Sequence, residues 1–242
     1  MKKVKKLLLI LLAALVLSGA AFGIYTADYY RMDETAAAVC AAPAGPYEIR
    51  NGGGRCLVFE PEYANAGLIF YPGGKVEYTA YAPLMALLRE RGVLCVLCKM
   101  PFNLAVLDGN AAEGIPARFP SVTRWYVGGH SLGGVMAAYY AADHADELEG
   151  LLLLAAYSTK DLTGSGLRVL TVRGSEDGVL NRSAYDKRLA CLPEDFRELV
   201  IEGGCHAFFG SYGDQRGDGV PTVSRQEQLS LTAQAAADFM LD

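Results

Sequence analysis

The chain has 242 residues, of which 52% are apolar and 20% are charged, and this length allows one globular α/β domain with a short additional segment. Its formal net charge is −5, and no cluster of lysine and arginine lies after residue 30. The charge balance therefore argues against nucleic acid as a partner.

The first 30 residues have the composition of a membrane-spanning segment. Four of the first six residues are lysines, and residues 7–25 contain no charge. A helix of that length would reach roughly 28 Å at ~1.5 Å per residue, close to the ~30 Å core of a bilayer. Tyr29 and Tyr30 follow where an interfacial aromatic belt would lie. The lysines before the segment and the acidic residues after it predict a cytoplasmic N-terminus, with the rest of the chain outside the membrane.

A cleaved signal peptide is the alternative interpretation of this segment. The small residues 18–21 would suit a signal peptidase, but the apolar run continues beyond them. We therefore favour a membrane anchor over residues 1–30. Residues 31–46 are rich in alanine, contain two prolines near their end, and are expected to form a stem. Residues 47–242 are expected to form a single domain.

Apolar runs alternate with helical patterns through the rest of the chain. Strands are expected at residues 47–50, 55–60, 67–71, 93–98, 125–127, 150–154, 167–172 and 196–201. Helical segments are expected at residues 78–91, 135–142, 183–191 and 224–240, and a broken helical stretch at roughly residues 103–118. Because several strands are uniformly apolar, we predict an eight-stranded, mostly parallel sheet with helices on both faces. In such sheets, ligands bind at the carboxyl ends of the strands.

The fifth strand runs into the segment 128–134, which reads Gly-Gly-His-Ser-Leu-Gly-Gly and opens a helix. Between Gly129 and Gly133 the pattern is Gly-x-Ser-x-Gly, and its place between a strand and a helix is the context of a nucleophile elbow. A serine at such a sharp turn has strained backbone geometry, so the residues two before and two after it must be small. The turn would lift the Ser131 hydroxyl clear of the sheet. An incidental serine in a glycine-rich turn is the alternative.

Two further turns at the same edge supply an acid and a base. Asp177 follows the seventh strand, three residues after Gly174, and His206 follows the eighth strand in a Gly-Gly-Cys-His turn. Glu176 is the competing acid, but Asp177 precedes Gly178, where the backbone can turn away and leave the carboxylate aimed inward. The alternative for His206 is a loop histidine without a catalytic role.

The order serine, aspartate, histidine, together with the elbow and the two turns, resembles the α/β-hydrolase superfamily. Within it, Tyr-Pro-Gly-Gly-Lys-Val at residues 71–76 and Lys-Met-Pro-Phe-Asn-Leu-Ala at residues 99–105 resemble the small bacterial group called the alpha/beta hydrolase fold-5 family. Members of that group often begin with a membrane-spanning segment. The resemblance covers about residues 25–242, and it implies the α/β-hydrolase fold with Ser131, His206 and Asp177 as a triad. It does not identify a substrate, because this fold carries many chemistries.

An oxyanion hole needs two N–H donors that point at the developing charge. Leu132, at the start of the helix after Ser131, is expected to supply one of them. The superfamily often has His-Gly-x after the third strand, where this chain has Pro72-Gly73-Gly74. Proline has no N–H, so the second donor is expected from Gly74, which aligns with the x, or from Gly73.

These residues predict a serine hydrolase that cleaves carboxylic esters through an acyl-enzyme, as carboxylesterases do, without a metal or a cofactor. Residues 155–166, after the sixth strand, are too few for a lid domain, so an open site is expected. An acyltransferase or peptidase with the same triad is one alternative, and a non-catalytic cell-surface module with the same fold is another. The expected partners are a small-molecule acyl or ester substrate and the membrane.

The six cysteines show no metal-ligand spacing. Cys95 and Cys98 lie three residues apart on one strand, so they should face opposite sides of the sheet and cannot bond to each other. A disulfide between Cys40 and Cys56 is conceivable in an exported chain.

Overall fold

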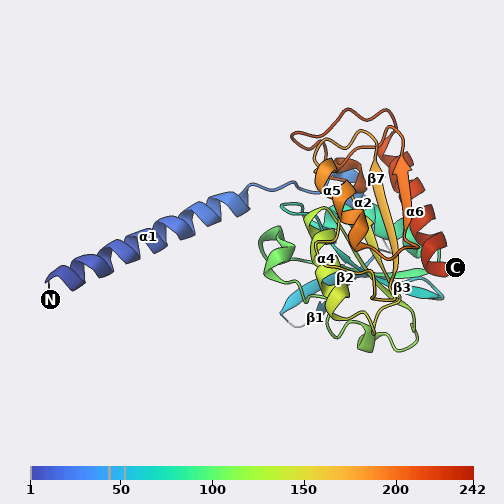
Figure 1. Cartoon of the computed structure of the whole chain (residues 1–242), viewed down its shortest axis with the longest axis horizontal. Helices are drawn as coiled ribbons and strands as arrows, with labels where there is room; N and C mark the ends of the chain where they lie inside the picture. The colour runs from blue at the N-terminus through green and yellow to red at the C-terminus, as the bar shows by residue number, and fades with distance from the viewer. Residues whose placement is uncertain (1, 43–44, 52) are drawn as a thin grey trace.

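The computed structural model describes residues 2–42, 45–51 and 53–242. Pro43 of the expected stem and Gly52 of the expected turn between the first two strands lie outside the described residues. The described residues form one eight-stranded sheet with helices on both faces, and a single long helix projects away from it (Figure 1). The predicted fold class, an eight-stranded and mostly parallel sheet between helices, is confirmed.

The sheet aligns the ends of its central strands. Its strands are β1 (Tyr47–Asn51), β2 (Gly54–Phe59), β3 (Ala66–Tyr71), β4 (Val93–Cys98), β5 (Trp125–His130), β6 (Gly150–Leu154), β7 (Arg168–Gly174) and β8 (Arg197–Ile201). Their order is β1-β2-β4-β3-β5-β6-β7-β8; β2 is antiparallel to both neighbours, and the pairs from β4 to β8 are parallel. In this register Tyr71 lies beside Gly129, and His130 lies beside Leu154. The turns after β3, β5 and β6 therefore meet at one edge.

Helices cover both faces of the sheet. The α-helices are α1 (Lys2–Ala27), α2 (Glu34–Ala41), α3 (Ala82–Arg89), α4 (Leu132–Asp143), α5 (Arg182–Arg188) and α6 (Arg225–Leu241). The 3₁₀ turns are η1 (Tyr78–Tyr81), η2 (Pro101–Asn103), η3 (Ala105–Leu107), η4 (Pro116–Arg118), η5 (Leu189–Cys191) and η6 (Ala207–Phe209). Residues of α3 and α6 pack on one face with Leu68 and Phe70, whereas α4 packs on the other with Ile69 and Tyr71. This alternation along β3 is that of a strand buried on both faces.

Most elements lie where the patterns predict them. β4 and β6 have the predicted bounds, and α6 begins after Ser224, whose hydroxyl accepts a hydrogen bond from the Glu227 N–H as a helix cap. The broken helical stretch expected at roughly residues 103–118 consists of separate 3₁₀ turns, without an α-helix among these described residues. Gly109 and Gly114 favour turns over a continuous helix there.

The long N-terminal helix α1 is exposed along its whole apolar length. Within its segment Val4–Ala27, an 18-residue window has a mean hydropathy of 2.7 and no buried residue, and only Thr26, near the end of the helix, is buried. At ~1.5 Å per residue, its 24 residues reach roughly 36 Å, which is enough to cross a bilayer. In Figure 1 this helix is a straight rod that points away from the sheet.

The segment expected as a stem packs on the domain. The Tyr30 N–H donates to the Lys75 carbonyl, and the Asp33 N–H donates to the Ser211 carbonyl, each at 2.8 Å. Asp33 also caps α2, which packs against α3. The chain therefore joins the domain within a few residues of the end of α1.

The six cysteines are all free thiols. Cys95 and Cys98 lie in the cores on opposite faces of the sheet, as predicted. The disulfide between Cys40 and Cys56 is excluded, because Cys40 packs against the core that contains Cys95 and Cys56 lies in the other core. Cys56 instead lies opposite Cys98 on the neighbouring strand, with the two Sγ atoms 3.7 Å apart.

Candidate active site

The elbow serine lies at the junction of β5 and α4. Ser131 has φ 52° and ψ −124°, a conformation that residues other than glycine rarely adopt. Its N–H donates to the Leu154 carbonyl at the end of β6 (2.9 Å), and its carbonyl accepts a bond from the Val135 N–H in α4 (3.1 Å). These bonds hold the strained turn from both sides, which is the geometry that the Gly-x-Ser-x-Gly pattern predicts.

Two glycines make this turn possible because larger residues would not fit. A Cβ atom on Gly129 would lie 2.5 Å from the backbone carbonyl carbon of Gly133. A Cβ atom on Gly133 would overlap the carbonyl oxygen of Tyr71 at the end of β3. The start of α4 is therefore in direct backbone contact with β3, which brings Leu132 next to the turn that follows β3.

His206 and Asp177 form a buried pair at the carboxyl ends of β8 and β7. The Nδ1 atom of His206 lies 2.8 Å from Oδ2 of Asp177, and both side chains are 2% exposed. The other carboxylate oxygen accepts hydrogen bonds from the N–H groups of Val179 (2.9 Å) and Leu180 (2.8 Å). Because the carboxylate is fixed in this orientation, it favours the tautomer with hydrogen on Nδ1, and Nε2 is left free to accept a proton.

The competing acid, Glu176, has different surroundings. It is exposed, and its Oε1 atom accepts a hydrogen bond from the Ser175 hydroxyl at 3.1 Å. Asp177, and not the exposed Glu176, is the residue whose carboxylate is bonded to Nδ1 of His206.

Ser131 and His206 line one cavity of about 260 Å³, which we call the serine cavity. Its lining is mostly apolar and consists of Ser131, Leu132, Val135, Ala155, Ala156, Tyr157, Val179, Leu180, Asn181 and His206. Among the described residues, no hydrogen bond joins the Ser131 hydroxyl to His206. Such bonds often tighten only when substrate is bound, so the geometry is compatible with a serine and its base.

The turn after β3 leaves one N–H free beside Leu132. The Gly73 N–H donates to the Tyr81 hydroxyl (3.0 Å), and the same hydroxyl is hydrogen-bonded to Nδ1 of His130 (2.8 Å). Gly74 lies against Leu132, since a Cβ atom on Gly74 would come within 2.9 Å of the Leu132 Cδ2. Leu132 is the first residue of α4, so its N–H has no acceptor within the helix. No described residue accepts a hydrogen bond from the Gly74 N–H, so Gly74, rather than Gly73, is free to act with Leu132.

His130 packs against the candidate base. The two imidazole rings have centroids 4.5 Å apart, and the His130 side chain is buried. Burial, together with the neighbouring His206, holds the pKa of His130 well below its usual range. His130 is therefore neutral and does not oppose a positive charge on His206. Tyr81, which orients both His130 and the turn after β3, was not singled out in the sequence because its helical pattern indicates only core packing.

Strained residues gather at this edge of the sheet. The described residues other than glycine that have positive φ are Lys75 (59°), Phe102 (52°), Asn103 (57°), Ser131 (52°) and Ala155 (47°). Each lies just after β3, β4, β5 or β6. Such conformations cost roughly 1–3 kcal/mol each and cluster at functional sites. Their placement supports this edge, rather than another part of the molecule, as the site.

Asp218 joins the acid turn to the histidine turn and was not predicted from the sequence. Its carboxylate accepts hydrogen bonds from the N–H groups of Gly178, His206, Ala207 and Gly219, at 2.8–3.1 Å. Burial alone would raise the pKa of Asp218, but these four donors outweigh it and hold the pKa below its usual value. The pair Asp218-Gly219 predicts a turn in the sequence, but it does not predict that this turn folds back onto the turn that contains His206.

We expect Asp218→Asn to destabilise the protein at neutral pH and to lose this effect in acid. The charged form of Asp218 is favoured in the folded state. Its contribution to the free energy of unfolding is therefore complete above the unfolded pKa of about 3.9, and it is lost as the pH falls through the lower folded pKa. Urea unfolding of both proteins at several pH values measures this. The difference in the free energy of unfolding between wild type and variant should become smaller below about pH 4. A difference that does not change with pH would contradict the role of the charge.

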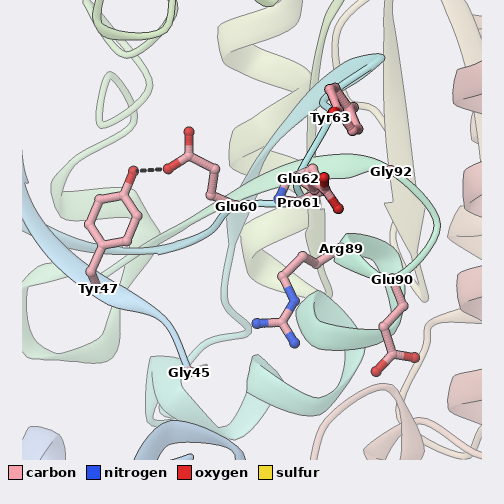
Figure 2. Close-up of a pocket in the computed structure, with 9 residues that line it drawn as sticks. All are labelled: Gly45, Tyr47, Glu60, Pro61, Glu62, Tyr63, Arg89, Glu90 and Gly92. Atoms are coloured by element: carbon pink, nitrogen blue, oxygen red, sulfur yellow. Dashed lines mark hydrogen bonds between the residues drawn. The ribbon is translucent and has the colours of Figure 1, made fainter. Parts of the chain in front are cut away.

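A larger hollow, of about 690 Å³, lies at the opposite edge of the sheet, before β3 and β4 (Figure 2). Figure 2 shows the Tyr47 hydroxyl bonded to Glu60, with Arg89 and Glu90 across the hollow. Burial and the bond to Glu60 raise the pKa of Tyr47 to about 12, so this phenol is no base at neutral pH. The residues that line this hollow include no serine, cysteine or histidine. Within the described part of the chain, no group of three or more histidine, cysteine or acidic side chains is placed to hold a metal ion.

The comparisons with known proteins agree with the class of protein that the sheet and the elbow define, an α/β hydrolase. Residues 67–230 match the model of the alpha/beta hydrolase family. The match spans more than half of the chain, and this protein therefore belongs to the alpha/beta hydrolase family, as the motifs predicted. No curated protein sequence matches the chain.

Solved structures share the fold at low sequence identity. Est1E from Butyrivibrio proteoclasticus has a TM-score of 0.59 and 16% identity, covering 81% of this chain and 98% of its own. Thermogutta terrifontis esterase 2, phosphoramylated by tabun, has a TM-score of 0.59 and 13% identity, with coverages of 81% and 96%. A bacterial membrane phospholipase A has a TM-score of 0.60 and 14% identity, covering 97% of both chains.

Proposed function

We propose that this protein is a serine hydrolase that cleaves carboxylic esters, with Ser131 as nucleophile, His206 as base and Asp177 as the acid that orients the base. The observation that carries this proposal is the buried 2.8 Å bond between His206 and Asp177, next to a cavity that His206 and Ser131 both line. Esterases among the structural neighbours support the same class of reaction.

In the proposed reaction, the Ser131 oxygen attacks the carbonyl carbon of the ester while its proton passes to Nε2 of His206. The carbonyl oxygen takes the electron pair and is held by the N–H groups of Leu132 and Gly74. The Asp177 carboxylate stabilises the imidazolium that forms. When the tetrahedral intermediate collapses, the bond to the alkoxide breaks, His206 protonates the alkoxide, and the acyl group remains on Ser131.

Water completes the proposed cycle by attacking the acyl-enzyme, again with His206 as base, to release the carboxylic acid and restore the serine. Ser131 is half-buried rather than enclosed. The connection between β6 and β7, residues 155–167, contains no helix or strand in the described structure that would form a lid domain. Access of water to Ser131 supports hydrolysis over transfer of the acyl group to another acceptor.

Hydrolysis of p-nitrophenyl esters tests this function. We expect the full-length chain, purified in detergent, to hydrolyse p-nitrophenyl acetate and butyrate with saturation kinetics. The full chain is the proper material because Tyr30 is bonded to the backbone around Lys75 and Glu77, next to the site. A protein that is folded by circular dichroism but turns over no ester of the panel would contradict the proposal.

We further propose that α1 anchors the protein in the cytoplasmic membrane, with the catalytic domain outside. The helix continues unbroken through residues 18–21 to Ala27, which supports an anchor over a cleaved signal peptide. We expect the protein to sediment with membranes and its domain to be cut by a protease added to intact cells. A soluble mature form whose N-terminal sequence begins near Ala21 or Phe22 would instead select the signal peptide.

A further inference from the structure

The loop after β4 exposes apolar side chains for which the protein core offers no reason. Phe102, Val106 and Leu107 are 59%, 51% and 49% exposed, and none of them lines the serine cavity. Phe102 also has φ 52°, a conformation that is costly for an aromatic residue. Exposure of the Phe102 ring to water is unfavourable and does not offset the cost of its strained backbone. We therefore expect the ring to contact an apolar environment in the working protein. We call these three residues the apolar loop.

The apolar loop contacts the end of the anchor helix. The ring of Phe22 in α1 packs edge-on against the ring of Phe102, with centroids 5.2 Å apart. Nearby, the ammonium group of Lys75 lies 4.6 Å from the centroid of the Tyr25 ring and 3.0 Å from Oδ2 of Asp28. The exposed apolar surface of α1 thus continues to Phe102 of the apolar loop.

Asn103, which follows Phe102 in the chain, is bonded to the turn that carries the proposed oxyanion donor. The Lys75 N–H donates to the Asn103 carbonyl at 2.8 Å, and Lys75 follows Gly74 in the chain. Gly74 in turn lies against Leu132 at the mouth of the serine cavity. Contacts therefore run from the end of α1, through Phe102 and Asn103, to the residues beside Ser131.

We propose that the apolar loop rests on the bilayer that holds α1, and that the substrate is a glycerolipid ester of that membrane. This inference rests on the proposed function and on the role of α1 as an anchor. Aromatic and aliphatic side chains at the end of a spanning helix lie at the boundary between head groups and acyl chains, which is the depth of glycerolipid ester bonds. The contact between Phe22 and Phe102 keeps the serine cavity at that boundary, whereas a long flexible linker would let the cavity move away from the membrane.

The size of the serine cavity agrees with a lipid that stays partly in the bilayer. Its volume of about 260 Å³ is below the ~300–1,000 Å³ of pockets that enclose a whole small molecule. The aliphatic side chains of Leu132, Val135, Val179 and Leu180 line it, as suits the first carbons of an acyl chain. Only the ester and these carbons need to leave the membrane.

The experiment uses the full chain reconstituted in vesicles of phosphatidylethanolamine and phosphatidylglycerol, and it measures released fatty acid. The test variant combines Phe102→Asn, Val106→Ser and Leu107→Gln; asparagine tolerates the left-handed backbone at position 102. The control combines Tyr63→Ser and Leu231→Gln, two apolar residues that are 75% and 46% exposed on other parts of the surface. Hydrolysis of p-nitrophenyl butyrate in detergent is measured for each protein.

We expect wild type and control to release fatty acid, and the apolar-loop variant to release about tenfold less or lower still, because less apolar surface holds the site on the bilayer. Its butyrate hydrolysis should stay within about twofold of wild type, since no atom of the serine cavity changes. If wild type hydrolyses butyrate but no vesicle lipid, or if the variant releases fatty acid at the wild-type rate, the inference is overturned and the esterase function stands. If wild type hydrolyses neither substrate, the proposed function itself fails.

Discussion

Replacing either Ser131 or His206 with alanine is expected to lower the turnover of p-nitrophenyl butyrate by ~10³-fold or more. The serine oxygen is a weak nucleophile unless a base takes its proton, and His206 is the base that shares its cavity. Because the two residues act as a unit, the double variant should be little worse than either single variant. Steady-state rates of the three variants, compared with wild type, measure this.

Two matched variants show whether the losses are specific. Ser183→Ala changes an exposed serine of α5, and His144→Ala changes a histidine whose Nδ1 atom lies 2.9 Å from the Tyr140 carbonyl, outside the serine cavity. Both should keep activity within about twofold of wild type, as expected of distant substitutions. Full activity in Ser131→Ala would end the proposal of a serine hydrolase.

Replacing Asp177 with asparagine is expected to leave the protein folded and to lower turnover steeply. The loss should approach the ~10⁴-fold value known for the same change in the triad of an unrelated protease. The asparagine oxygen can still accept from the N–H groups of Val179 and Leu180, so the turn should keep its shape. Its amide would then face Nδ1 of His206 as a donor and favour the tautomer in which Nε2 carries the hydrogen and cannot accept the serine proton.

Glu176→Gln is the matched control for this substitution, because it makes the same chemical change one residue earlier. Glu176 is exposed and bonded to Ser175, so its variant should stay within a few-fold of wild-type activity. Esterase rates should be measured beside melting temperatures. A nearly normal Asp177→Asn together with an inactive Glu176→Gln would reverse the assignment of the acid and leave the serine and histidine untouched.

The parts of the site that could be predicted from the sequence are those that follow strands directly. Ser131, Asp177 and His206 stand one, three and five residues after β5, β7 and β8, so the parallel sheet alone brings them to one edge. The sequence of Gly129 to Gly133 also identified the strained turn, since backbone contact with Gly133 leaves no room for a side chain at Gly129. The structure brings these residues together as expected, and their catalytic roles stay predictions.

The parts that could not be predicted depend on contacts between loops distant in the sequence. Asp218 binds the histidine turn only because the chain after η6 folds back, and no local pattern specifies that path. Tyr81 looks like an ordinary core residue until its hydroxyl is seen between Gly73 and His130. The opposition of Cys56 and Cys98 likewise requires that β4 lie beside β2, an order that hydrophobic periodicity does not reveal.

Labelling with a fluorophosphonate tests the central claim most directly, because it reports an activated serine without a choice of substrate. The serine oxygen displaces fluoride from phosphorus and keeps the phosphonyl group, so mass spectrometry of a digest identifies the modified residue. We predict stoichiometric modification of the peptide that contains Ser131 in wild type, much slower modification in His206→Ala, and none at this peptide in Ser131→Ala. A folded wild-type protein that remains unlabelled, or that is labelled on a different serine, would contradict the assignment of Ser131 as the nucleophile.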